Sequence, residues 1–118
     1  MTHWKAAILG VVCVLLVSIY FTSTVFGYVG EVVIVNAATE PIKNGELEVC
    51  GQKFLFGELR QGKSRAIQYK VKSDSHFELR VEFFSGKQFS KGLGYVTSGR
   101  DFKHVLTVKD DEASIELQ

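Results

Sequence analysis

The sequence predicts an all-β fold: a small antiparallel β-sandwich of seven or eight strands, immunoglobulin-like or transthyretin-like, preceded by one N-terminal transmembrane helix. Three observations predict it. The chain has 118 residues, which is enough for one domain and a short additional element. Residues 6–30 carry no charged side chain. From residue 30 onward, apolar residues recur at every second position, which is the period of a half-buried strand.

The uncharged run divides the chain into an anchor, residues 1–29, and a domain, residues 30–118. About 20 apolar residues suffice to cross a bilayer as a helix, and the run would extend roughly 36 Å at ~1.5 Å per residue. Trp4 and Tyr28 stand near its two ends, where aromatic rings favour the headgroup level. A cleaved signal peptide, cut near Tyr28 to release a secreted domain, is the alternative interpretation.

The charges beside the run predict its orientation. Lys5 and the amino terminus precede it, whereas Glu31 and Glu40 follow it. Positive residues stay preferentially in the cytoplasm, so the domain is expected outside it, in the periplasm if the organism is a bacterium. Small residues four positions apart within the run would let two helices approach closely, and the predicted contact residues are Ala6, Gly10, Ser23 and Gly27.

Eight stretches of the domain have strand patterns. They are residues 31–37, 46–50, 53–56, 64–72, 76–84, 88–97, 103–109 and 113–117. The first is apolar on both faces, which is typical of a strand covered on two sides or lying close to a membrane. Residues 64–72 and 76–84 alternate clearly, and Ser73-Asp74-Ser75 between them is turn chemistry. We therefore expect a hairpin in which Lys70 lies opposite Glu78.

The run from Val33 to Val49, a strand followed by a loop and a short second strand, resembles part of transthyretin-like and immunoglobulin-like modules. It carries no diagnostic motif, and no family is assigned from it. The Cys-Trp-Cys arrangement of immunoglobulin domains is absent, because the sole tryptophan is Trp4.

The composition and motifs argue against most chemistries. Fourteen basic and thirteen acidic residues nearly cancel, whereas a nucleic-acid binder usually has a basic excess. Cys13 and Cys50 are expected in different environments, so no disulfide between them is expected. Cys50 is expected on the polar face of its strand, as a half-buried thiol or, alternatively, in a bridge to another chain. His76 and His104 stand at ordinary surface places, lack a metal-ligand spacing with Cys50 and have no evident orienting carboxylate. We therefore expect no catalysis, metal or cofactor.

Two stretches are candidates for recognition. Glycines flank a tyrosine in the first, where a partner backbone or a sugar ring could approach closely, and its residues are Gly92, Gly94, Tyr95 and Thr97. The alternative is a bulged strand with this tyrosine in the core. The second is a basic run that could meet anionic lipid headgroups close to the anchor, or else form a solvated face, and its residues are Arg60, Lys63 and Arg65.

By exclusion, the sequence predicts a non-enzymatic, single-pass membrane protein. Its exported sandwich would bind another protein as an accessory, assembly or scaffolding component of an envelope complex. The alternatives are a secreted or anchored ligand-binding or inhibitor module of the immunity type, and a carbohydrate-binding sandwich that uses Tyr95. Each alternative rests on fold-level analogy.

Overall fold

The computed structural model describes residues 27–118, and in this range it contains eight β-strands and no helix. The strands are β1 (Tyr28–Asn36), β2 (Ile42–Val49), β3 (Gln52–Leu59), β4 (Ser64–Val71), β5 (Ser75–Phe83), β6 (Gln88–Val96), β7 (Phe102–Val108) and β8 (Ala113–Leu117).

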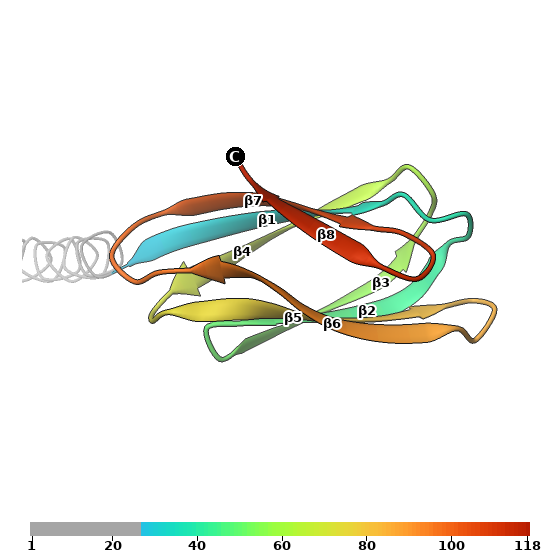
Figure 1. Cartoon of the computed structure of the whole chain (residues 1–118), viewed down its shortest axis with the longest axis horizontal. Coiled ribbons are helices and arrows are strands. Elements are labelled where there is room, and N and C mark those ends of the chain that lie inside the picture. The colour runs from blue at the N-terminus through green and yellow to red at the C-terminus, as the bar shows by residue number, and fades with distance from the viewer. Residues whose placement is uncertain (1–26) are drawn as a thin grey trace, which may run out of the picture.

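The strands form two packed sheets of four strands each, in the orders β4-β1-β7-β8 and β3-β2-β5-β6 (Figure 1). All neighbouring strands are antiparallel except β1 and β7, which run parallel. Strand β1 therefore lies in the middle of its sheet, between an early and a late segment of the chain. This all-β sandwich agrees with the predicted fold class.

One core fills the space between the sheets, because alternate residues of every strand point inward. The side chains of Phe77 and Phe83 from one sheet and Ile34 and Leu106 from the other are fully buried. The buried Asn36 is satisfied: its Nδ2 donates to the carbonyl oxygen of Leu59 at 2.8 Å, and its Oδ1 accepts from a backbone N–H at 2.9 Å. This amide therefore links the end of β1 to the β1–β2 connection and to the last residue of β3.

Two glycines let aromatic rings lie against the backbone inside the core. A Cβ at Gly30 would stand 2.1 Å from the ring of Tyr69, and a Cβ at Gly45 would stand 2.1 Å from the ring of Phe56. Both rings are buried. These positions therefore require glycine because a side chain has no space there, not because of a left-handed backbone.

The predicted strands all occur, but the predicted hairpin between residues 64–72 and 76–84 is wrong. Strand β4 pairs with β1, and β5 pairs with β2 and β6, so the two strands lie in different sheets. Lys70 lies opposite Val29, and Glu78 opposite Glu48 and Gly92. The alternation of each strand agreed with a hairpin because both sheets turn their apolar faces toward one core.

The environments expected for Cys50 and His104 are also wrong. Cys50 is buried at the turn between β2 and β3, where its φ of 49° is left-handed, instead of lying on a polar strand face. His104 is 3 % exposed instead of lying at the surface. The pairing of β7 beside β1 places His104 opposite Val32, on the inner face of the sheet.

The predicted anchor lies largely outside the described residues, and so do Ala6, Gly10, Cys13 and Ser23. Gly27 is described, and a Cβ there would meet no atom within 4 Å. From residue 27 to the C-terminus, the structure has no helix with the length and apolar character to span a membrane.

Candidate functional site

A β-bulge interrupts β6 at the glycine-flanked tyrosine. The register between β5 and β6 shifts at this point. Phe77 lies opposite Leu93, but Ser75, two residues earlier in β5, lies opposite Val96, three residues later in β6. Strand β6 therefore holds one extra residue at this point, as the glycines predicted. Gly94 adopts φ +71°, a left-handed conformation that a larger residue rarely takes.

The bulge turns Tyr95 out of the core. By simple alternation Tyr95 would point inward two residues after Leu93, but the extra residue shifts the pattern and Val96 is buried instead. Tyr95 is 57 % exposed. The alternative with this ring in the core therefore does not occur.

Next to Tyr95, the inner side of β6 packs closely against neighbouring side chains, whereas its outer side faces solvent. A Cβ at Gly94 would stand 3.0 Å from the ring of Phe77 and 3.1 Å from Ile115 of β8. The Lys91 Nζ donates to the carbonyl oxygen of Ala113 at 2.8 Å, which joins the edges of the two sheets. Thr97, the last predicted recognition residue, is half-buried in the loop after β6.

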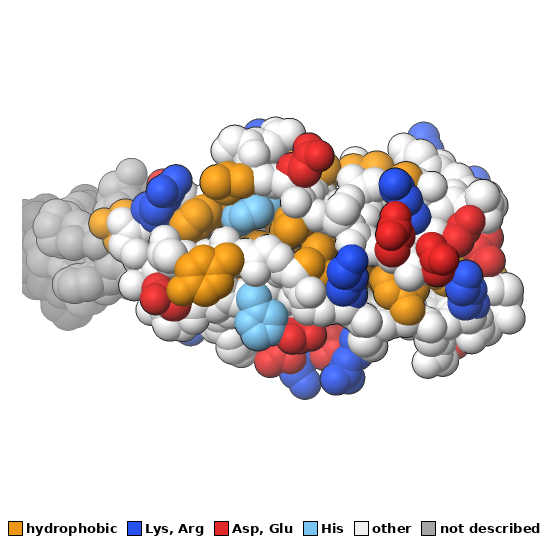
Figure 2. Space-filling view, in the orientation of Figure 1, with side chains coloured by type: hydrophobic (Ala, Val, Ile, Leu, Met, Phe, Trp, Pro, Cys, Tyr) orange, Lys and Arg blue, Asp and Glu red, His pale blue; other side chains and the backbone are white. Residues whose placement is uncertain are grey.

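Figure 2 views the side of the sandwich on which β6 and β8 lie in front. Hydrophobic side chains and both described histidines gather on the half of this side nearer the start of β1, whereas charged side chains gather toward the other half. Leu117 of β8 is 58 % exposed, and Phe102 is half-buried beneath the guanidinium of Arg100, which stands 4.8 Å from the ring centre. The bulge thus belongs to a partly apolar side.

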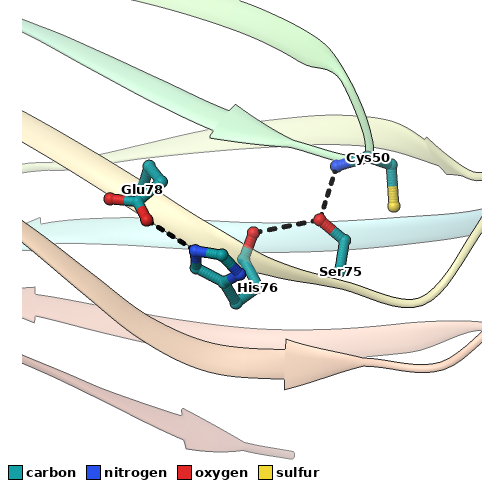
Figure 3. A network of polar contacts seen from close by, with 4 residues as sticks. All are labelled: Cys50, Ser75, His76 and Glu78. Atoms are coloured by element: carbon teal, nitrogen blue, oxygen red, sulfur yellow. Dashed lines mark hydrogen bonds and ion pairs between the residues drawn. The ribbon is translucent and has the colours of Figure 1, made fainter.

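A polar network begins at the first residues of β5 (Figure 3). The Ser75 hydroxyl accepts a hydrogen bond from the backbone N–H of Cys50 at 3.0 Å and donates to the carbonyl oxygen of His76 at 3.1 Å. On the outer side of the strand, His76 Nε2 lies 2.5 Å from Glu78 Oε1. Glu78 was not expected as a partner of His76, although residues two apart on a strand share a face.

This network does not form a nucleophile with a base. The hydroxyl of Ser75 is bonded to backbone atoms, and the imidazole of His76 is bonded to Glu78 instead of to that hydroxyl. The thiol of Cys50 donates to the carbonyl oxygen of Ser73 at 3.4 Å. Together these hydrogen bonds connect the β2–β3 turn to the β4–β5 loop and to Ser75.

The second histidine is enclosed by aromatic rings. His104 stacks on Phe102 at 5.7 Å between ring centres and meets the edge of Phe77 at 5.1 Å. Burial lowers the pKa of His104 from its ordinary 6.5. Within residues 27–118 no three His, Cys, Asp or Glu side chains are grouped so that they could hold a metal ion.

The basic residues predicted to meet lipid headgroups lie at the end of the sandwich opposite Tyr28. Tyr28 pairs with Val71, whereas the carbonyl oxygen of Lys63 accepts from the backbone N–H of Asn36 at the other end of β1. Arg60 and Arg65 flank that same β3–β4 connection. The three basic residues therefore lie at the end of β1 that is farther from the predicted anchor.

A shallow groove of about 750 Å³ crosses the outer face of the β3-β2-β5-β6 sheet. Its lining combines charged side chains, among them Glu46 and Arg80, with apolar ones such as Leu55, which is 82 % exposed. Tyr95 is not among the lining residues. The groove and the exposed tyrosine are therefore separate features.

No family model matches this sequence, and no curated protein matches it significantly. Among solved structures, the "NMR structure of the protein from Eubacterium rectale" is similar to this chain with a TM-score of 0.52 and 12 % sequence identity. The match covers 75 % of this chain and 87 % of that chain. At this identity the likeness concerns the fold alone.

Proposed function

We propose that this chain is a non-enzymatic, single-pass membrane protein whose extracytoplasmic sandwich binds another protein as an accessory or assembly component of an envelope complex. The observation that carries the proposal is the Tyr95 bulge: a left-handed Gly94 turns a large aromatic side chain away from the core into solvent. Exposed aromatic residues are the commonest anchors of protein interfaces. A residue turned outward by a conformational device is better explained by recognition than by packing.

The position of the bulge supports a protein partner. Strand β6 is at the edge of its sheet and pairs only with β5, so its free edge can accept an extended segment of a partner through main-chain hydrogen bonds. A tyrosine beside such an edge would add an apolar face and a hydroxyl to the contact. The partner is therefore expected to present an extended segment to β6.

Of the two sandwich types suggested by the sequence, we favour the transthyretin-like type. In a constant-type immunoglobulin sandwich, the first two strands pair within one sheet. Here β1 and β2 lie in different sheets, and β1 pairs with β4 and β7 instead. The strand order therefore differs from the immunoglobulin arrangement.

The membrane part of the proposal rests on the uncharged run of residues 6–30, which leads into β1 with no linker between them. Alkaline washing of isolated membranes tests it. We expect the full-length chain to stay in the membrane pellet. Recovery of a shortened soluble chain that begins near Tyr28 would support the secreted alternative instead.

Affinity purification of the tagged full-length chain in a mild detergent, followed by mass spectrometry, tests the partner. We expect one envelope protein to copurify in a stoichiometric amount and to be reduced at least tenfold by Tyr95→Ala. The matched control is Leu55→Ala, which truncates another exposed side chain on the opposite edge strand, β3. Equal recovery with both variants would contradict the proposal, and retention on a glycan column that depends on Tyr95 would favour the carbohydrate-binding alternative.

A further inference from the structure

The outer face of the β4-β1-β7-β8 sheet carries an uncharged centre of small and β-branched residues. Adjacent strands align its outward side chains in rows, two of which are Ser64–Val35–Thr107–Ser114 and Ala66–Val33–Val105–Glu116. A third row, Gln68–Glu31–Lys103, borders them on the side of Tyr28. We call these three rows the valine face.

The outer face of the other sheet is different. Its central strands place glutamates at 46, 48, 78 and 82 around Arg80, and Lys53 lies 3.7 Å from Glu46. Such a face is well solvated and needs no cover. On the valine face, in contrast, Val33, Val35 and Val105 are half-buried with no side chain of the described residues above them to complete their burial. An apolar centre with a polar border is the usual anatomy of a protein interface.

We propose that a second copy of this chain covers the valine face, with a two-fold axis that runs along the strands between β1 and β7. The direction of the axis rests on the proposed membrane anchor, because two copies in one membrane must both enter their sandwiches at the Tyr28 end. Closed two-fold symmetry is the commonest arrangement of homo-oligomers. This axis places β1 of one copy over β7 of the other, row by row.

The rows complement one another under this symmetry. Val33 faces Val105 of the partner copy, and Val35 faces Thr107 of the partner copy. The two-fold axis repeats each of these contacts, so the apolar centres of both copies are covered. Glu31 faces Lys103 of the partner copy, and the reciprocal pair forms on the other side of the axis. The remaining charged residue of the three rows, Glu116, faces Ala66 of the partner copy, so no two like charges meet.

The size of the face predicts a weak contact that needs the membrane. Four strands ~4.8 Å apart and on average about seven residues long present roughly 450 Å² per copy. The dimer therefore buries about 900 Å², which is in the range of weak interfaces. Confinement of both copies to one membrane raises their effective concentration. We therefore expect dimers of the full-length chain in membranes at natural abundance.

A mixed charge reversal tests this arrangement. Two differently tagged full-length copies are produced together, and the fraction captured as mixed pairs is measured after mild solubilisation. Glu31→Lys in both copies, or Lys103→Glu in both copies, should lower pair capture at least fivefold, because like charges then face each other. A Glu31→Lys copy combined with a Lys103→Glu copy should restore it, because both facing pairs are again opposite.

The mixture separates contact between copies from stability within one copy. Glu31 and Lys103 are also neighbours in the sheet of one copy. Each variant therefore has two like charges side by side in its own sheet, and mixing the two variants does not remove them. Only the contact between copies can be restored in the mixture. The matched control uses the neighbours Glu46 and Arg80 on the other sheet, where Glu46→Lys and Arg80→Glu should leave pair capture unchanged. Loss without rescue in the mixture, or no loss in either variant, would overturn the proposal. Neither outcome depends on Tyr95 or on the alkaline wash, so failure here is distinct from failure of the proposed function.

Discussion

His104 occupies a place in the core where a charged imidazole is disfavoured. Its ring lies between Phe102 and Phe77, and its Nδ1 is buried with no hydrogen-bond partner among residues 27–118. Burial lowers its pKa in the folded state below the 6.5 of an exposed histidine. The neutral ring therefore stabilises the fold fully above pH 6.5, and this stabilisation is lost as the pH falls through the folded-state pKa.

We therefore expect the free energy of unfolding to fall as the pH drops below the 6.5 of an exposed histidine. Replacement of His104 by Leu should flatten this dependence, as measured by denaturant titration at each pH. The control is His76→Gln, which removes an exposed imidazole and should leave the acid loss in place. An unchanged pH dependence in His104→Leu would assign the acid sensitivity to other groups.

Tyr69 has the opposite titration behaviour. Burial, with a smaller contribution from Cys50, raises the pKa of its phenol from 10.0 to about 12. The contribution of the neutral Tyr69 phenol to stability is therefore fully present below pH 10 and is lost as the pH rises through about 12. Its hydroxyl is also buried without a hydrogen-bond partner among the described residues.

The change Tyr69→Phe removes this unpaired hydroxyl and keeps the ring over Gly30. We expect it to raise the free energy of unfolding by up to about 1 kcal/mol at neutral pH and to reduce the alkaline loss of stability. Denaturant titration at neutral and alkaline pH measures both effects. A loss of more than about 1 kcal/mol would mean that the hydroxyl has a partner.

At the scale of the strand, the β2–β3 pair contains two glycines in different environments. A Cβ at Gly45 would enter the ring of Phe56, whereas a Cβ at Gly57 would meet nothing within 4 Å. Gly45→Ala should therefore lower the free energy of unfolding by about 1–3 kcal/mol through overpacking. Gly57→Ala is the matched control and should stay within about 0.5 kcal/mol of the natural chain. Equal effects in thermal or denaturant unfolding would contradict the packing of Phe56.

The strands were predictable and their partners were not. Alternation marks which residues of 64–72 and 76–84 face a core, but a core between two sheets gives the same pattern as a hairpin in one sheet. The two arrangements differ in the partner of β4, which pairs with β1, whereas β5 lies in the other sheet. This long-range choice leaves no local signal at Ser73-Asp74-Ser75.

The candidate site was predictable to a similar degree. The glycines around Tyr95 indicated a bulge, and the bulge occurs, but the direction of the ring depends on one extra residue in the register. The burial of His104 depends on the parallel pairing of β7 with β1, which joins residues far apart in the sequence. The His76–Glu78 pair, in contrast, was accessible from spacing alone, because both residues lie on one face of one strand.

Both sheets depend on one core. Val81 lies near its centre at 3 % exposure, and Val81→Asp would place an unpaired charge there. We expect this variant to lose both sheets in one step, as measured by circular dichroism in the far and near ultraviolet. Ser90→Asp, on the exposed side of neighbouring β6, is the control and should remain folded. Cooperative folding of Val81→Asp would contradict the single core.

The parallel pairing of β1 with β7 has a consequence for biogenesis. The segment that the ribosome makes first in the domain sits between β4 and β7, and Gly30 meets Phe102 only after most of the chain has been synthesised. A nascent chain that lacks its last quarter has nothing to shield that flank of β1, so the sandwich closes only after translation is nearly complete. Chaperones that protect exposed strand edges would act on this protein during that interval.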